Sequence, residues 1–191
     1  MALYSNGADT RNTGADLVLG YAASYAGWGQ VDWSAAANVN HARLTDVKAA
    51  PAVLSGQQVL DQSARSYLEL AAPQYRLNLG ALWRSGSWAV NLRESVFGPS
   101  AYLATLDNVR HYESRSAAKF ITDLDVTAQL NKAWSLSAGA NNLFNAYPDK
   151  LNGDYRKALN AAGRQNVAQY PSFSPIGING ADYYGKAAYR F

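Results

Sequence analysis

The residues best able to do chemistry in this chain are two histidines and a pair of aspartates. His41 and His111 lie far apart and lack the His-x-x-x-His spacing of a metal site, and the chain contains no cysteine. Histidine and cysteine are the common zinc ligands, and cysteine is also a nucleophile. A metal site or a Ser/His/Asp triad is therefore not favoured. We expect His41 to end a strand and His111 to lie in a loop.

Asp123 and Asp125 are two positions apart, so on a β-strand their side chains share one face. Two carboxylates placed in this way could serve acid–base catalysis. We favour the alternative that they belong to a polar wall, and we expect no catalytic residue, no metal and no cofactor. Four basic residues would balance the charge of that wall: Arg76, Arg93, Lys186 and Arg190.

A third group consists of basic and aromatic residues in segments that show no β periodicity. Arginine supplies charge-assisted hydrogen bonds and tyrosine supplies rings for stacking, as contacts to an anionic, catechol-like or polar ligand require. The alternative is that they are solvated loop residues, or that they contact phosphates of lipopolysaccharide. These ligand-binding candidates are Arg110, His111, Tyr112, Tyr155, Arg156, Arg164 and Tyr170.

The composition is unusual for a soluble domain of 191 residues. Charged residues make up 16% and aromatic residues 12%, with 13 tyrosines, whereas about 25% charged residues is typical. This mixture suits a protein with one surface in lipid. Because no apolar run approaches the roughly 20 residues of a membrane-spanning helix, we expect any crossing to be made by strands. A net charge of +3 without a basic stripe argues against nucleic-acid binding.

Apolar and polar residues alternate with a period of two in several segments, as in β-strands with one apolar face. We expect about seven strands, near residues 14–24, 30–40, 74–84, 88–96, 120–130, 134–140 and 181–191. Short turns near residues 27, 86 and 132 alternate with long loops at 42–73, 98–118 and 146–181. Four of the five tryptophans lie near the short turns. Bacterial outer-membrane barrels combine short periplasmic turns, long external loops and aromatic girdles; a soluble β-sandwich explains neither feature.

The alternation also predicts which side chains share a face. Residues expected to face lipid are Tyr21, Trp33, Leu79, Leu92, Val126, Leu136 and Tyr189. Residues expected on the opposite, inward face are Asp32, Asn78, Asn91, Asp125, Ser137 and Arg190. Glu94 breaks the pattern, which suggests an interface or a bulge, and Asn141-Asn142 suggests a bulge or the membrane edge. In the third long loop we expect a short helix capped by Asp154 and ended by Gly163.

Three segments resemble parts of TonB-dependent outer-membrane receptors, in the order of that family. Leu136 to Lys150 resembles the NLF-x-x-YPD segment near the end of those receptors, Ser174 to Tyr184 resembles their SPFGFNG-x-YY segment, and Thr13 to Leu17 resembles an earlier T-x-G-x-E-L strand opening. The first motif is carried by Asn142, Leu143, Phe144, Tyr147, Pro148 and Asp149. The terminal strand, through which the barrel assembly machinery would act, carries Tyr183, Tyr189 and Phe191.

The resemblance implies an all-β fold in which residues 1–191 form an antiparallel transmembrane β-barrel fragment. The family's wall has 22 strands, so about seven strands would form an open, curved sheet, and the strands at Gly14 to Ser24 and Ala181 to Phe191 would be unpaired edges. Met1 to Gly7 lacks the features of a secretory signal. We therefore expect a C-terminal portion that lacks the plug domain, the TonB box and the upstream strands.

The function implied by the resemblance is energy-coupled uptake of a scarce ligand across the Gram-negative outer membrane. A ferric siderophore or another iron complex is the favoured ligand, with cobalamin or a carbohydrate as alternatives. The TonB complex would act through the missing plug, and outer-membrane lipid and lipopolysaccharide would surround the wall. Two other hypotheses remain open: a small self-standing barrel of structural or adhesive type, and an outer-membrane hydrolase.

Overall fold

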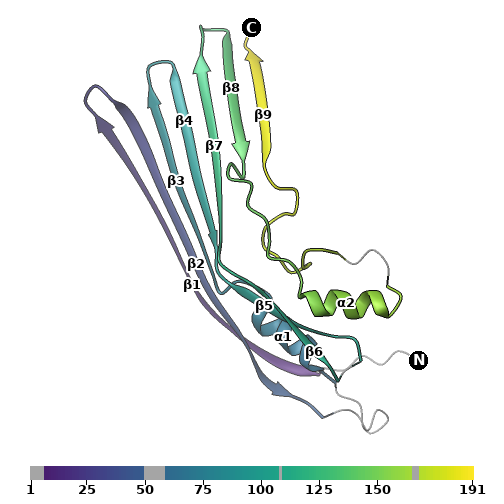
Figure 1. Cartoon of the computed structure of the whole chain (residues 1–191). Helices are drawn as coiled ribbons and strands as arrows, with labels where there is room; N and C mark the ends of the chain where they lie inside the picture. Colours follow the sequence, from purple (N-terminus) through teal and green to yellow (C-terminus); the bar gives the residue numbers. More distant parts are fainter. Residues whose placement is uncertain (1–6, 50–58, 108, 165–167) are drawn as a thin grey trace.

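The computed structural model describes residues 7–49, 59–107, 109–164 and 168–191 (Figure 1). Seven strands form one antiparallel sheet in the order β1-β2-β3-β4-β7-β8-β9, and β5 and β6 pair separately. The strands of the sheet are β1 Ala8–Tyr25, β2 Gly29–Val47, β3 Tyr75–Ser85, β4 Trp88–Phe97, β7 Lys119–Gln129, β8 Trp134–Asn141 and β9 Asp182–Tyr189. The other elements are α1 Gln62–Leu70, β5 Ser100–Thr105, β6 His111–Ser116 and α2 Gly153–Ala161.

The sheet is open. Each strand pairs antiparallel with its neighbour, and β1 and β9 are the two edges, with no pairing between them in the described parts of the chain. The prediction of an all-β, open, antiparallel seven-stranded sheet is therefore confirmed. Strand number is what alternation specifies well, because every strand repeats the same two-residue period.

The ladder also confirms the predicted sharing of faces. Tyr21 lies opposite Trp33, Ala81 opposite Leu92, and Val90 opposite Val126, so the predicted apolar residues follow one face across the strands. Asn91 lies opposite Asp125, and Asp125 opposite Gly139, on the other face. The apolar face is uncovered, as exposed fractions of 70% for Tyr21 and 47% for Trp33 show. Which face meets lipid stays a prediction.

The two ends of the sheet differ. The turns β1–β2, β3–β4 and β7–β8 lie at one end together with the C-terminus, whereas α1, α2, β5 and β6 gather at the opposite end (Figure 1). We call these the turn end and the loop end. Tryptophans pack at the turn end: the Trp83 indole N–H donates to the Trp28 carbonyl (2.7 Å), and the rings of Trp134 and Tyr189 lie 4.9 Å apart. The expected asymmetry of turns and loops is present.

Three predicted loops contain more regular structure than the sequence indicated. β1 begins at Ala8 rather than near residue 14, and β2 continues to Val47, because these extensions pair with each other across a register shift at Asp9/Thr10. Residues 8–13 and 41–47 carry polar side chains on both faces, so alternation does not reveal them. Residues 1–6 of the expected N-terminal loop and 50–58 of the first long loop lie outside the described residues.

The second long loop, predicted without regular structure, contains the β5–β6 hairpin, in which Ser100 pairs with Ser116 and Thr105 with His111. This hairpin prolongs the β4–β7 ladder beyond a break at residues 98–99 and 117–118. In the third long loop the helix is present as α2, but its N-cap is Asn152 rather than Asp154. Asp154 lies in the first turn, and Gly163, with φ 75°, follows the helix as predicted.

Two irregular positions in the predicted alternation are explained differently by the structure. The ladders on both sides of Glu94 continue without a shift, so it lies in regular strand and the suggested bulge is wrong. Asn142 follows the last residue of β8 with φ 53°, so the Asn141-Asn142 pair marks the end of a strand and not a bulge within it. Asparagine tolerates the left-handed conformation that this exit requires.

Little of the apolar surface is buried, and most of what is buried lies near the loop end. The described residues include no large side chain that is fully buried. Buried residues around the helices and the hairpin are Ala71, Ala104, Leu159, Ile176 and the serines Ser63, Ser66, Ser100, Ser114 and Ser116. Neither helix in the described part of the chain is long and apolar enough to cross a membrane.

Candidate functional site

A pocket of about 650 Å³ lies at the loop end, where four separate segments meet. Its size falls in the range of small-molecule sites. Five ring side chains line it: Tyr67 of α1, Tyr102 of β5, Tyr155 of α2, and Tyr170 and Phe173 of the loop before β9. The remaining lining residues are Leu151, Ala168, Gln169, Pro171, Ser172 and Ile178. We call this the aromatic pocket.

The rings of the aromatic pocket contact one another. Tyr67 and Tyr102 meet edge to face with centroids 6.1 Å apart, and Tyr102 lies 5.5 Å from Phe173 at a tilt of 46°. Tyr155 packs against Tyr112 of β6 at 5.4 Å. Such tilted and edge-to-face pairs are the favoured arrangements of aromatic rings. Tyr102 therefore holds a central position, in contact with two other rings.

Helix α1 is held in place by hydrogen bonds from the neighbouring strands. The Asp61 side chain caps the helix by accepting from the Ala64 amide (2.7 Å). The Leu103 amide of β5 donates to Ser66 Oγ (2.9 Å), and the Leu44 amide of β2 donates to Glu69 Oε1 (2.8 Å). These bonds hold α1 between β2 and β5, so that Tyr67 faces Tyr102.

Helix α2 is fixed by the residue just before it. Asn152 caps the helix by accepting from the Asp154 and Tyr155 amides. The same residue ties the helix to β6, since its amide donates to Ser114 Oγ (3.0 Å) and its side-chain nitrogen donates to the Glu113 carbonyl (2.9 Å). Tyr155 is thereby placed beside the hairpin. One asparagine thus both starts the helix and positions a ring of the pocket.

The structure brings together three of the predicted ligand-binding candidates: Tyr155 and Tyr170 line the pocket, and Tyr112 packs behind Tyr155. The other four candidates do not line it. Arg110 is exposed and pairs with Asp107 (3.4 Å), and His111 is exposed at the start of β6. Arg156 lies on α2 with a buried Nε that has no hydrogen-bond partner, and Arg164 is exposed after the helix.

Sequence reasoning did not identify Tyr67, Tyr102 and Phe173 as site residues. Tyr67 and Tyr102 belong to segments that were expected to be loops without regular structure. A signal was present, since Ser100–Thr105 and His111–Ser116 are two runs of equal length separated by five residues that include a turn-like Asp-Asn pair. Phe173 gives no local signal, because only tertiary packing brings its loop against β5.

The electrostatics of the pocket favour uncharged groups. Burial, followed by the proximity of Tyr155, Asp61 and Tyr67, raises the pKa of the Tyr102 hydroxyl above its ordinary value. The phenol therefore stays protonated at neutral pH and can both donate and accept a hydrogen bond. None of the lining residues carries a charge.

The segment that resembles the receptor motif acts as a structural connector. The Asn142 side chain accepts from the Ala146 amide and donates to the Ala146 carbonyl, both at 2.8 Å, which closes a tight loop. Asn145 accepts from the Ala181 amide just before β9 (2.9 Å). A β-carbon on Gly180 would collide with this Asn145 side chain and with the Tyr147 hydroxyl, so a glycine is needed there.

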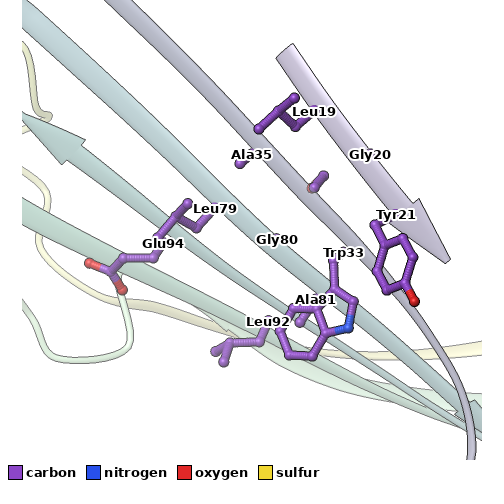
Figure 2. Close-up of a pocket in the computed structure, with 11 residues that line it drawn as sticks. Leu19, Gly20, Tyr21, Trp33, Ala35, Leu79, Gly80, Ala81, Leu92 and Glu94 are labelled. Carbon is purple, nitrogen blue, oxygen red and sulfur yellow. The ribbon is translucent and has the colours of Figure 1, made fainter. Parts of the chain in front are cut away.

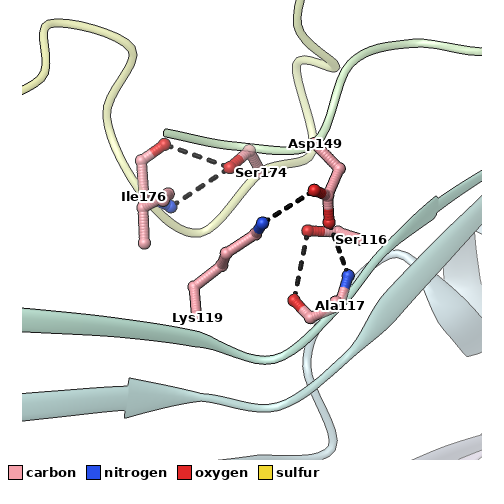
Figure 3. Close-up of polar contacts among 6 residues, drawn as sticks. All are labelled: Ser116, Ala117, Lys119, Asp149, Ser174 and Ile176. Carbon is pink, nitrogen blue, oxygen red and sulfur yellow. Dashed lines mark hydrogen bonds and ion pairs between the residues drawn. The ribbon is translucent and has the colours of Figure 1, made fainter. Parts of the chain in front are cut away.

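Asp149 ends this motif and joins it to the start of β7 (Figure 3). Lys119 Nζ donates to Asp149 Oδ1 (2.8 Å), and the Ala117 amide donates to Oδ2 (2.7 Å). The hydrogen bond from Lys119, aided by the Ala117 amide, lowers the pKa of the Asp149 carboxyl. Ring stacking of Tyr147 on Tyr170, at 6.0 Å, links the same motif to the aromatic pocket.

The other motif residues and the terminal strand carry exposed rings. Phe144 is exposed, and Pro148 and Leu143 are buried or half-buried beside it. Tyr183 is exposed on β9, and its hydroxyl reaches the Leu143 carbonyl at 3.4 Å. At the turn end, Tyr189 lies between the rings of Trp134 and Phe191.

The polar face of the sheet carries hydrogen-bonded and ionic pairs. Asp123 pairs with Arg93 (3.6 Å) and accepts from the Asn142 amide, and Asp125 accepts from the Tyr184 hydroxyl (2.9 Å). In residues 7–49, 59–107, 109–164 and 168–191, no group of three His, Asp or Glu side chains is arranged to hold a metal ion.

A second hollow, of about 410 Å³, lies on the apolar face of the sheet (Figure 2). The small side chains of Ala35 and Ala81 leave space between Tyr21 and Trp33 on one side and Leu79 on the other. Glu94 lies at its edge, and its carboxylate accepts a hydrogen bond from the Thr122 hydroxyl of the neighbouring strand. The hollow is lined almost entirely by apolar groups.

Comparison with known proteins leaves the site to be interpreted from its own chemistry. No protein-family model matches the chain, and a search of curated proteins finds no match.

Proposed function

We propose that this chain forms part of the wall and the external loops of a TonB-dependent receptor in the Gram-negative outer membrane. One observation carries the proposal: an open antiparallel sheet whose uncovered apolar face alternates with a polar face, with its short turns and packed tryptophans at one end. Membrane barrels are built in this way, whereas a soluble sheet covers its apolar face with other protein. The three motif-like segments add support from the sequence.

In this proposal the turn end lies in the periplasm and the loop end outside the cell. The loops capture a scarce ligand, for which the family resemblance favours a ferric siderophore or another iron complex. The TonB complex opens the lumen by pulling on a plug domain, and the terminal strand is recognised by the barrel assembly machinery. We assign capture of the ligand to the aromatic pocket, which lies at the loop end.

A small self-standing barrel is the second candidate, because it shares the alternating strands and aromatic turns. The open edges at β1 and β9 favour the receptor, since a small barrel must close on itself to satisfy the backbone hydrogen bonds of its edge strands. The coding sequence upstream separates the two: a plug-like segment supports the receptor, and a signal peptide directly before this chain supports the small barrel.

The membrane assignment can be tested by spin labelling, because the chain has no cysteine to interfere. Single cysteines would replace Leu92 and its neighbour Asn91 in the intact gene product, reconstituted in lipid vesicles. We expect the label at 92 to collide with dissolved oxygen, which concentrates in lipid, and the label at 91 to collide with a water-soluble nickel complex. A label at 92 that neither reagent reaches would mean a protein core, and would refute the proposal.

A further inference from the structure

The aromatic pocket lacks the groups that an anionic ligand requires. An anion that leaves water needs a cation or several hydrogen-bond donors in the pocket, since an uncompensated charge is costly to bury. The lining residues consist of five rings, apolar side chains and the uncharged polar groups of Gln169 and Ser172. Among the anionic, catechol-like and polar ligands expected from the sequence, the pocket therefore favours one without net negative charge.

Four basic residues around the loop end pair with carboxylates. Lys119 pairs with Asp149 (2.8 Å), and Arg115 pairs with Glu113 (2.9 Å). Two further ion pairs join Lys157 to Asp154 (3.1 Å) and Arg110 to Asp107 (3.4 Å). Each pair satisfies a cation that could otherwise attract an anionic ligand.

A carboxylate near the pocket has the opposite sign from what an anion needs. Asp61 caps α1 and is close enough to Tyr102 to contribute to the raised pKa of its hydroxyl. The negative charge of Asp61 also disfavours a negative ligand nearby. A protonated phenol suits a neutral ligand with hydroxyl groups, because it can donate to one oxygen and accept from another.

We propose that the aromatic pocket binds an uncharged ring that carries hydroxyl groups, as in a neutral sugar or an uncharged phenol. The faces of Tyr102 and Phe173 stack on the ring of the ligand, while tyrosine hydroxyls, Gln169 and Ser172 hydrogen-bond its edge. Aromatic residues with a polar tip serve both purposes at little cost in conformational entropy. The inference rests on the proposed function only in regarding the pocket as the capture site of an uptake receptor.

The test is direct binding to the purified intact protein in detergent, with three sets of probes: an array of neutral oligosaccharides, an array of uncharged polyphenols, and a triply negative ferric tris-catecholate chelate. We expect binding in one of the first two arrays, which identifies the source of the ring, and none of the chelate. Tyr102→Ala should weaken that binding at least about tenfold, as for an aromatic anchor in a pocket.

Two variants guard against misinterpretation. Tyr155→Ala removes a second ring from another element and should also weaken binding, so an effect of Tyr102→Ala on folding alone would be recognised. Tyr25→Ala, at the turn end, is the matched control and should leave binding unchanged.

Binding of the chelate that Tyr102→Ala abolishes would overturn the inference, and so would the absence of binding in both neutral arrays. The proposed function fails separately, through the spin labels at positions 91 and 92, which report on the membrane and not on the pocket.

Discussion

At the scale of single residues, the motif that suggested a receptor family has a structural explanation in this fold. Each of three polar residues accepts a hydrogen bond from a backbone amide. Asn142 accepts from its own loop, Asn145 from the entry to β9, and Asp149 from the entry to β7. They therefore hold the third long loop against the sheet. Their spacing reflects where the chain must turn after β8, and none of them lines the aromatic pocket.

Asp149 gives a residue-scale prediction. Asp149→Asn should destabilise the attachment of this loop by about 1 kcal/mol, because a charge-assisted bond is lost and partial exposure screens it. The Ala117 amide donates a hydrogen bond to Asp149, so hydrogen exchange at this amide should become faster in the variant. Asp154→Asn is the control, since its pair with Lys157 is exposed and local to α2.

The effect should depend on pH in a defined direction. Because the pKa of Asp149 is lowered from 3.8 in the folded protein, its stabilisation is fully present above that value. It is lost as the pH falls through the lowered pKa, where the folded carboxylate takes up a proton. The difference between the wild type and Asp149→Asn should therefore be present at pH 7 and vanish in strong acid. A difference that persisted unchanged in acid would show that the ionised carboxylate is not responsible.

Glu94 gives a second residue-scale prediction, which depends on lipid facing the apolar side of the sheet. A carboxylate in a lipid-facing strand is unfavourable, so Glu94→Leu should raise the free energy of unfolding of the intact protein in lipid vesicles, measured by denaturant titration, by up to about 2 kcal/mol. Glu94→Gln should show part of the gain, since it removes the charge and keeps a partner for Thr122. Loss of stability in both variants would indicate that this face meets water or protein.

At the scale of elements, the aromatic pocket is built by pieces that contribute little to the sheet. α1, the β5–β6 hairpin and α2 lie beyond the ends of the sheet strands and contact each other through Ser66 and Asn152. These elements lie outside the sheet, and the sheet ladder is complete without them. Their sequence can therefore change without disturbing the strands. In the proposed receptor, ligand specificity and membrane insertion should therefore be separable.

Deletion of residues 154–163, most of α2, tests this separation. The deletion removes Tyr155 from the pocket and frees Tyr112, so binding of the neutral ligand should fall at least about tenfold. The strands β7, β8 and β9 keep their ladder, so the amount of intact protein in the outer membrane should be unchanged. Unchanged affinity in a binding assay on cells would remove α2 from the site.

At the scale of the whole molecule, the two open edges decide how the chain behaves alone. β1 is 18 residues long and β9 is 8 residues long, and each presents backbone groups that no other described strand pairs. Exposed edges of this kind associate with other strands. In the proposed receptor, upstream strands of the same protein cover both edges.

Residues 1–191 refolded in detergent should therefore self-associate, whereas the intact gene product should be monodisperse. Size-exclusion chromatography with light scattering measures both. Proline substitutions at alternate positions along the outer edge of β9 should reduce the association, because proline removes backbone donors. If residues 1–191 were monomeric and kept their β-strand content, the backbone groups of both edges would have to be hydrogen-bonded within the chain, as in a closed barrel.

The sequence by itself determined the sheet. Alternation with a period of two is a local property, so strand number, the sharing of faces and the positions of the short turns were all predicted from it. The sequence also showed that Glu94 departs from the alternation, but it did not show that the backbone there is regular. The open edges followed from the count of strands together with a family resemblance, and the ladder agrees.

Only the tertiary structure decided the pocket. Tyr67, Tyr102, Tyr155 and Phe173 are distant in the chain, and no periodicity relates a helix, a hairpin and an irregular loop. The extensions of β1 and β2 were also hidden, because both faces are polar there and alternation carries no signal. The places of the predicted arginines also depended on the tertiary structure: Arg110, Arg156 and Arg164 do not line the aromatic pocket, whereas Tyr155 and Tyr170 do.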